Sequence, residues 1–281
     1  MPTVVSPMKA GPECLDCLRN LARQTTEFAT SDSLVRSEIE REVAKILERL
    51  SPETVPTDLS NEFHPVIKKL SGNPDPYRER KLREIEMAKL AFSKIRPRED
   101  LRSCVEIAAQ GNAIDFFVDP ESLGRELSVR PNFVIDDIAK LERKLEGVKD
   151  ILYLADNAAE VFFDLPLLTF LGRKARVGYV VKESPVQNDL AVGDIRLTGL
   201  RLPAEIIPSP ATVGFYPDRA SPQLRERFAR TDLVVAKGMG NYETLSKLPE
   251  SGKFFYIFRA KCGPVARSLG VKVGDYVAML R

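Results

Sequence analysis

The chain contains one histidine, His64, and this scarcity nearly excludes a zinc site built from several histidines. No segment approaches the roughly 18 consecutive apolar residues of a membrane-spanning helix, so no membrane partner is expected. The net charge is only +2, which gives no general attraction to nucleic acid or to an anionic surface. An anionic substrate must therefore be held by local groups, and oxygen ligands and lysines are the side chains expected to carry chemistry.

Tryptophan is absent and side-chain amides are few, with 4 glutamines and 8 asparagines among 281 residues. Together with the abundant charged residues, this composition predicts a thermophilic source. Residues 1–10 lack the long apolar run of a secretory signal, so the cytoplasm is the expected location. The length and the hydrophobic content of 43% predict a globular protein with one large domain or two modest ones.

The four cysteines include one pair, Cys14 and Cys17, at a spacing found in metal and redox sites. A tetrahedral zinc site needs two further ligands, and the chain has no second such pair, although Cys262 can supply a third thiol. The simpler interpretation is a structural pair of thiols in the first turn of a helix, or a disulfide. The sequence leaves these alternatives open.

Apolar residues at helical spacing predict a helical N-terminal part. The predicted helices cover residues 14–29, 32–50, 59–70, 77–95, 101–117 and, after a gap, 131–145. From residue 150, short apolar runs alternate with amphipathic segments, which indicates an α/β fold with a doubly wound, mostly parallel sheet. Strands are predicted at 151–156, 176–182, 206–207, 233–237, 254–260 and 276–280. The predicted division is a helical domain over 1–117 and an α/β domain over 118–281.

Two acid–amide pairs, Asp156-Asn157 and Asn188-Asp189, follow two consecutive predicted strands. The carboxyl ends of parallel strands meet at one edge of a sheet, where such folds bind ligands. Carboxylate and amide oxygens suit Mg²⁺ or Mn²⁺, and the general affinity order adds Co²⁺ and Ni²⁺. Aspartate and asparagine are also common in turns and caps. Their occurrence at both strand ends favours a metal site, in which either aspartate could instead act as a nucleophile.

A glycine-containing loop follows the predicted strand 233–237 and contains Lys237, Gly238 and Asn241. Glycines let the backbone approach a ligand, and N–H groups at a helix start bind anions. The loop completes neither a Walker motif nor a dinucleotide fingerprint, and a tight turn is the alternative. Lys182 and Lys261 also lie near strand ends, where a lysine can meet a phosphate or remain a solvated surface charge.

Taken together, these motifs resemble the damage-control phosphatase family, which is also described as protein-glutamate O-methyltransferase-like. The resemblance covers almost the whole chain in order, and the paired cysteines indicate the stand-alone archaeal and bacterial branch of the family. The motifs that carry it are Cys14-x-x-Cys17, Gly111-Asn112-x-x-Asp115-Phe116, Asp156-Asn157-Ala158-Ala159-Glu160, Asn188-Asp189, Lys237-Gly238-x-Gly240-Asn241-Tyr242-Glu243 and Lys261-Cys262.

The resemblance implies a helical N-terminal part packed on a Rossmann-like core, and metal-dependent hydrolysis of small phosphorylated metabolites. Sugar phosphates and damaged phosphorylated cofactor precursors are the implied substrates. Asp156, Asn157 and Asp189 are the implied metal ligands. The implied catalytic residues are Asp156, Asp189 and Lys237, and the implied substrate-binding residues are Asn112, Asp115, Lys182, Asn188, Lys237, Gly238 and Asn241. Ala159 departs from the family, which usually has glycine there, and its methyl group could narrow the approach to the metal.

Two other functions are alternatives. One is an S-adenosylmethionine-dependent protein carboxyl methyltransferase, although the strand that ends at Asp156 is not followed by the glycine-rich loop that this cofactor usually needs. The other is a non-catalytic protein that binds a phosphorylated metabolite through the Lys237 loop.

Overall fold

The computed structural model describes residues 8–112 and 129–281, and its centre is a seven-stranded sheet. The strands are β1 (Phe133–Asp136), β2 (Asp150–Leu154), β3 (Arg176–Lys182), β4 (Glu205–Ser209), β5 (Leu233–Lys237), β6 (Phe254–Arg259) and β7 (Tyr276–Leu280). Their order is β1-β7-β6-β5-β2-β3-β4, and all neighbours are parallel except β6 and β7. This confirms the predicted mostly parallel α/β fold.

Helices cover both faces of the sheet, because alternate strand residues face opposite sides. In β2, Ile151 and Tyr153 belong to one buried cluster, whereas Leu152 and Leu154 belong to the other. The first cluster is covered by α4 (Arg78–Phe92), α5 (Leu101–Gly111), α7 (Ile138–Leu145) and α8 (Val161–Gly172). The second is covered by α10 (Pro222–Arg230), α11 (Gly238–Leu245) and α12 (Gly263–Leu269). The short helices η1 (Ala158–Glu160) and α9 (Val192–Thr198) follow β2 and β3.

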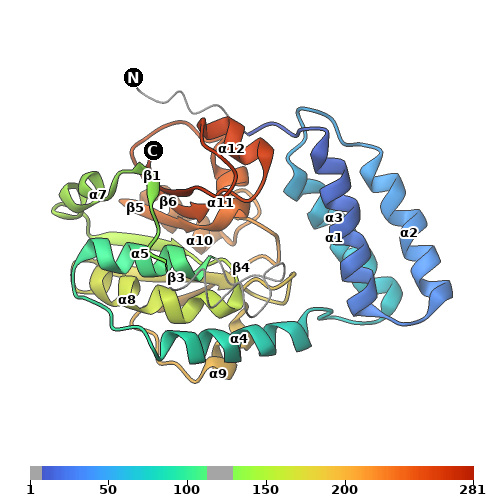
Figure 1. The fold of residues 1–281 in the computed structure, drawn as a ribbon, viewed down its shortest axis with the longest axis horizontal. Helices are drawn as coiled ribbons and strands as arrows, with labels where there is room; N and C mark the ends of the chain where they lie inside the picture. Colours follow the sequence, from blue (N-terminus) through green and yellow to red (C-terminus); the bar gives the residue numbers. More distant parts are fainter. Residues whose placement is uncertain (1–7, 113–128) are drawn as a thin grey trace.

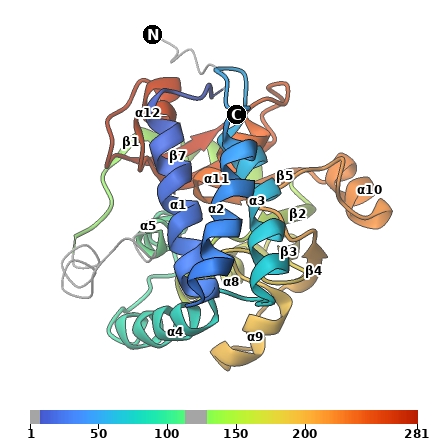
Figure 2. The ribbon, with the colours of Figure 1, turned by 90° about the vertical axis from the view of Figure 1, so that its right-hand side faces the viewer.

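The first three helices form a separate unit beside the sheet (Figure 1). They are α1 (Glu13–Ala29), α2 (Ser33–Leu47) and α3 (Pro56–Ser71). Leu18, Ile39 and Phe63 belong to a buried cluster made by these helices alone. Figure 2 shows the three helices running side by side in front of the core. We call α1–α3 the helical cap.

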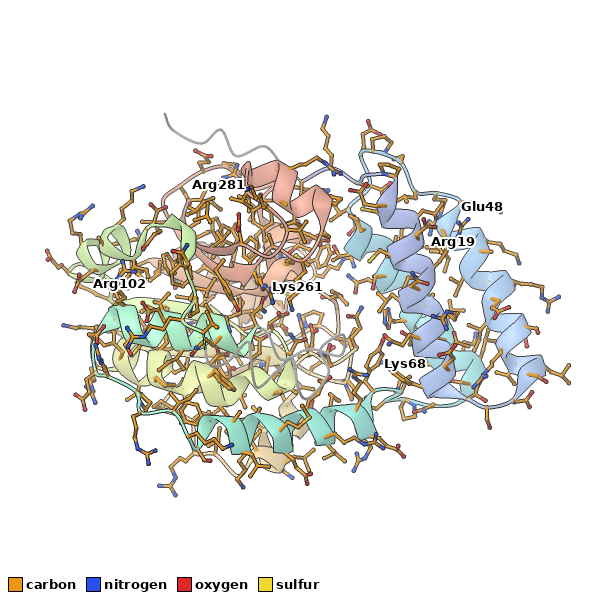
Figure 3. The ribbon with its side chains drawn as sticks, in the orientation of Figure 1. Arg19, Glu48, Lys68, Arg102, Lys261 and Arg281 are labelled. Atoms are coloured by element: carbon orange, nitrogen blue, oxygen red, sulfur yellow. The ribbon has the colours of Figure 1, made fainter. Side chains whose placement is uncertain are left out.

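The helical cap is fastened to loops of the α/β core through α3. The Asn61 side chain accepts a hydrogen bond from the Val213 amide at 2.7 Å and donates to the Val213 carbonyl at 3.1 Å. The Lys68 ammonium donates to the carbonyl of Pro185, and Figure 3 shows Lys68 and Lys261 on facing sides of the cap and the core. Helices α4 and α5, by contrast, share the buried cluster of the sheet. The predicted boundary between residues 117 and 118 lies outside the described residues and stays a prediction.

One predicted element differs from the structure, and one helix was not predicted. The helix expected over 131–145 begins only at Ile138, and the preceding Phe133–Asp136 forms the edge strand β1. The helix that was not predicted is α12, which begins at Gly263-Pro264. None of the helices within residues 8–112 and 129–281 is both long and apolar enough to cross a bilayer.

Candidate functional site

The loops that follow β2 and β3 are hydrogen-bonded to each other. The Ala158 amide donates to the Asn188 carbonyl at 2.8 Å, and Asn157 forms an isolated bridge with Asp189. Because β2 and β3 are parallel neighbours, their carboxyl ends already lie at one edge of the sheet. The bonds between the loops complete the arrangement and bring Asp156 and Asn157 beside the second acid–amide pair.

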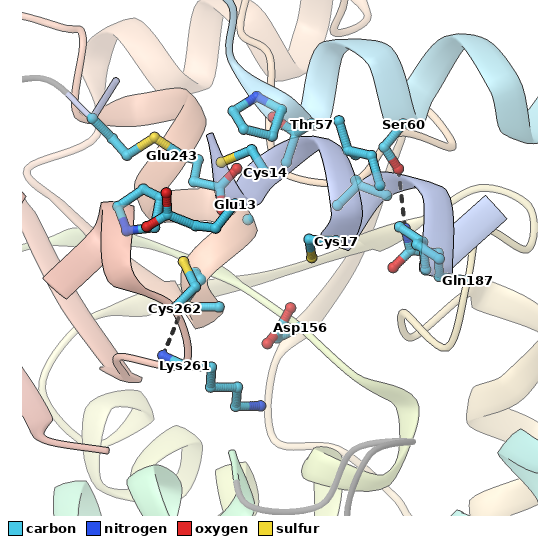
Figure 4. Close-up of a pocket in the computed structure, with 18 of the residues that line it drawn as sticks. Glu13, Cys14, Cys17, Thr57, Ser60, Asp156, Gln187, Glu243, Lys261 and Cys262 are labelled. Carbon is cyan, nitrogen blue, oxygen red and sulfur yellow. Dashed lines mark hydrogen bonds between the residues drawn. The ribbon is translucent and has the colours of Figure 1, made fainter. Parts of the chain in front are cut away.

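These loops form one wall of a cavity of about 650 Å³ between the core and the helical cap. We call Asp156, Asn157 and Asp189 the strand-end wall; all three line the cavity. The cap contributes mainly apolar and sulfur-containing side chains of α1, among them Cys14 and Cys17. Figure 4 shows Asp156 and Lys261 toward one side of this cavity and Cys14 and Glu243 toward the other.

Asp156 is held by two side-chain amides. Asn112 donates to Asp156 Oδ2 at 3.1 Å, and Asn157 donates to the same oxygen at 3.3 Å. Both amides also donate to Glu160 Oε1, at 3.0 and 2.6 Å. Burial raises the pKa of Asp156 well above its ordinary value, and the charges of Glu160 and Asp189 raise it further. Carboxylates crowded in this way need a neighbouring positive charge to remain ionised.

Gly238 lets the backbone after β5 approach Asp156 closely. Its φ of 76° lies in the left-handed region that glycine adopts without a steric cost. A Cβ atom at this position would lie 1.9 Å from Asp156 Oδ2. A side chain here would therefore displace the carboxylate of the strand-end wall.

Lys237 lies behind the strand-end wall. Its ammonium donates to Glu160 Oε2 at 2.6 Å and to Asp164 Oδ1 at 2.7 Å, and the side chain is 0% exposed. Burial alone would lower the pKa of Lys237, but Asp164 and Glu160 outweigh it and raise the pKa. In this arrangement the ammonium is enclosed and does not line the cavity. The sequence, by contrast, had suggested that Lys237 contacts a phosphate.

Two tyrosines complete the surroundings of Asp164. Tyr153 of β2 donates to Asp164 Oδ1 at 2.7 Å, and Tyr179 of β3 donates to Oδ2 at 2.9 Å. Both hydroxyls and the Lys237 ammonium therefore converge on one fully buried carboxylate. A buried ionic group is tolerated when its lone pairs are satisfied in this way.

Asp189 faces a second buried lysine. Lys182 Nζ lies 3.7 Å from Asp189 Oδ2 and also donates to the Gly214 carbonyl at 2.8 Å. Burial raises the pKa of Asp189 to about 6, although Lys182 opposes the shift. Burial likewise lowers the pKa of Lys182, against the attraction of Asp189 and Asp156.

The remaining predicted substrate-binding residues line the cavity, support the wall or lie outside the described residues. Asn188 lines the cavity and donates to Glu84 Oε2 of α4 at 3.3 Å. Asn241 donates to the Lys237 carbonyl at 2.8 Å and so closes the first turn of α11. Asp115 lies outside the described residues.

Two cavity residues were absent from the predicted site. Lys261, after β6, lines the cavity, and its charge acts to lower the pKa of Asp156. The signals in the sequence were its position after a strand and its place in the Lys261-Cys262 motif of the family resemblance. Glu243 of α11 also lines the cavity and is buried, and its Oε2 has no hydrogen-bond partner within the described residues.

The donor set of the strand-end wall fits a hard divalent cation. Asp156, Asn157 and Asp189 offer carboxylate and amide oxygens, the ligand types that Mg²⁺ and Mn²⁺ prefer. Glycine at position 238 leaves the Asp156 carboxylate in place, because a Cβ there would lie 1.9 Å from its Oδ2. The fold and the site thus define an α/β protein with a pocket at the carboxyl ends of its strands, and acidic side chains line part of that pocket.

Comparison with known proteins identifies the family. Residues 10–277 match the domain described as damage-control phosphatase ARMT1-like domain. A damage-control phosphatase of Pyrococcus horikoshii is 33% identical over 97% of this chain and 98% of its own length. A damage-control phosphatase of Archaeoglobus fulgidus is 30% identical over 96% of this chain and 99% of its own. The crystal structure of a DUF89 family protein from Pyrococcus horikoshii, 33% identical, matches with a TM-score of 0.87 over 97% of this chain and 99% of that one.

The chain belongs to the damage-control phosphatase ARMT1-like family. The resemblance seen in the sequence is therefore confirmed, and the family and its relatives support a phosphatase role.

Proposed function

We propose that this protein is a divalent-cation-dependent phosphatase whose reaction centre lies at the strand-end wall. The observation that carries the proposal is the pairing of the two loops, which sets Asp156, Asn157 and Asp189 along one side of a cavity. These three residues would hold the cation through their oxygen atoms. A bound cation supplies Lewis acidity and neutralises charge on the phosphoryl oxygens.

The chain adds its own positive groups for the phosphate. Lys261 lines the cavity near Asp156, and Met239 and Gly240 line it at the start of α11. A helix N-terminus presents N–H groups and a partial positive charge, which favour an anion. We assign the phosphate contact to Lys261 and to the α11 N-terminus.

Lys237 then acts as a positioning residue. Its ammonium neutralises Glu160, and Glu160 in turn accepts the amides of Asn112 and Asn157 that hold Asp156. This chain of contacts orients a metal-binding carboxylate from the side away from the cavity. Groups behind the metal ligands commonly tune metal affinity in this way.

The substrate class is a small phosphate monoester. The cavity of about 650 Å³ accommodates a phosphorylated metabolite, and the relatives named as phosphatases support this class. Sugar phosphates and damaged phosphorylated cofactor precursors both fit the proposal.

Hydrolysis of para-nitrophenyl phosphate by chelator-treated protein tests the function, with Mg²⁺, Mn²⁺, Co²⁺ or Ni²⁺ returned one at a time. We expect turnover only with a cation, and a loss of about 100-fold or more in Asp189→Asn, since such charge stabilisation contributes several kcal/mol. Asp218→Asn is the control, because Asp218 is an exposed acid that does not line the cavity. Equal activity in Asp189→Asn and Asp218→Asn would refute the proposal. Binding of orthophosphate without turnover of any ester would favour a non-catalytic binding protein.

A further inference from the structure

The cavity also has a second group of metal-ligating side chains, which do not belong to the strand-end wall. Cys14 and Cys17 lie in the first turns of α1, Cys262 directly precedes α12, and Glu243 lies on α11. All four line the same cavity. We call these four residues the thiol wall. They come from three segments of the chain that are far apart in sequence.

The four groups lie within electrostatic reach of one another. Burial is the largest cause that raises the pKa of Cys14 and of Cys17, and the charge of Glu243 raises both further. Burial raises the pKa of Cys262 to about 12, and Glu243, Cys14 and Cys17 all contribute. Burial and the charge of Asp58 raise the pKa of Glu243 itself to about 8. Three thiols and a carboxyl group thus lie around one cavity, and the charge of Arg267 acts to lower the pKa of Cys14.

Glu243 gives an independent indication of a ligand. The residue is 8% exposed, and its Oε2 has no hydrogen-bond partner within the part of the chain that the structure describes. A buried carboxyl oxygen without a partner costs free energy, about 1–3 kcal/mol, that a ligand would recover. Cys14, Cys17 and Cys262 are free thiols, and the Cys14 sulfur accepts a hydrogen bond from the Gly11 amide at 3.4 Å.

From this arrangement we infer that the thiol wall binds a thiophilic divalent cation such as Zn²⁺. Three thiolates and one carboxylate match the four-coordinate donor sets that zinc accepts, and the paired cysteines have a zinc-type spacing. On binding, each thiol gives its proton to solvent and forms a sulfur–metal bond. Sulfur ligands separate this site from the strand-end wall, whose oxygen ligands prefer harder cations.

Binding requires side-chain rotation. Across residues 8–112 and 129–281, no three acidic, thiol or imidazole groups already surround one point. Cys17 is exposed and Cys262 is partly exposed, so both have room to turn toward Glu243. An ion held by Cys17 and Cys262 would tie α1 of the helical cap to the core, beside the existing contact of Glu13 with Arg267 at 2.7 Å.

Titration of reduced, metal-stripped protein with Co²⁺ tests this inference. We expect a near-ultraviolet thiolate-to-cobalt absorption band that saturates at one equivalent and is erased by one equivalent of Zn²⁺. Cys17→Ser and Cys262→Ser should each lose the band and weaken Co²⁺ binding at this site more than about 100-fold, beyond the usual effect of an outer-shell change. Cys104→Ser is the matched control, because Cys104 is a free thiol of α5 that does not line the cavity.

Two further variants separate the site from the proposed function. Asp189→Asn should keep the cobalt–thiolate band while it loses phosphatase activity, and Glu243→Gln should keep its fold while it weakens the band. Circular dichroism checks that each variant is folded. A wild-type protein without the band, a band that survives Cys262→Ser, or a band that disappears in Asp189→Asn would each overturn the inference. So would a disulfide between Cys14 and Cys17 that persists in the reduced sample.

Discussion

The two walls of the cavity are built on different physical principles. In the strand-end wall each polar side chain has partners: Asp156 accepts two amides, Asn157 donates to Glu160, and Asp189 faces Lys182. In the thiol wall, Glu243 Oε2 has no hydrogen-bond partner among residues 8–112 and 129–281. The first wall is therefore fixed before any ligand arrives, whereas the second gains its missing contacts from a ligand. Chemistry requires the fixed arrangement, because catalytic groups act best when they are already oriented.

The largest expected effect comes from the buried charges behind the strand-end wall. Lys237→Met leaves Glu160 and Asp164 buried without their cation, and breaking such a pair costs about 3–5 kcal/mol. Urea unfolding should show a loss of this size in the free energy of unfolding. Lys247→Met, which changes an exposed lysine, should show almost none. Similar stabilities of the two variants would mean that the Lys237 network does not fix the wall.

The helical cap has its own pH response through its only histidine. His64 is buried and its Nδ1 lies 2.7 Å from the Ser60 carbonyl, and burial lowers its pKa to about 4. The unfolded chain takes up this proton near pH 6.5, so the stabilisation is present above pH 6.5 and is lost as pH falls toward 4. We expect wild type to lose on the order of 3 kcal/mol relative to His64→Leu over this range.

Chemical unfolding of both proteins at several pH values between 7 and 4 measures this difference. The other titrating groups are the same in both proteins, so their contributions cancel in the difference between the two free energies of unfolding. The single histidine also gives one proton resonance whose midpoint is directly readable by NMR. A midpoint near 6.5 would show that His64 is accessible and that the cap is looser than described.

A methyl group at Gly238 tests how closely the strand-end wall is fitted. Gly238→Ala places a Cβ against the Asp156 carboxylate, and a displacement of about 1 Å in such a site can cost 100-fold in rate. Gly252→Ala is a matched control, since Gly252 also has a positive φ of 66° but nothing within 4 Å of the added Cβ. Both variants carry a backbone cost of roughly 1–2 kcal/mol. Phosphatase kinetics should therefore separate the two variants, because only Gly238→Ala adds a clash with Asp156.

The smallest expected effect is that of Asn112→Ala. It removes one donor to Asp156 and Glu160 and an acceptor for the Arg259 amide at 3.0 Å. Loss of an outer-shell contact typically lowers metal affinity 10–100-fold. The Mn²⁺ concentration that gives half-maximal turnover should rise by that factor, whereas exposed Asn132→Ala should leave it unchanged.

The strand ends could be predicted from the sequence because local patterns of apolar and polar residues define them. Apolar runs followed by Asp156 and Asp189 marked the carboxyl ends of β2 and β3, and the structure places these loops together. The roles of Asp156, Asn157 and Asp189 as metal ligands stay a prediction. The same kind of local pattern led to the prediction that Lys237 contacts a phosphate, because Lys237 ends a strand and is followed by glycines.

The neighbours of Lys237 could not be found in this way. Glu160 and Asp164 lie on the segment after β2, and only the packing of β2 against β5 brings them to the Lys237 side chain. The edge strand β1 was missed for a related reason. Its 4 residues pair with β7, which lies more than a hundred positions away in the sequence. So short a strand has no local pattern strong enough to outweigh the helical spacing of the apolar residues that follow it.

Calorimetric titration of chelator-treated protein with Mn²⁺ examines the division between the two walls most directly. Mn²⁺ prefers oxygen ligands, so one ion should bind per chain in wild type and in Cys17→Ser, and Asp189→Asn should abolish that binding. Undiminished Mn²⁺ binding in Asp189→Asn, or its loss in Cys17→Ser, would show that the strand-end wall is not the centre that holds the hard cation.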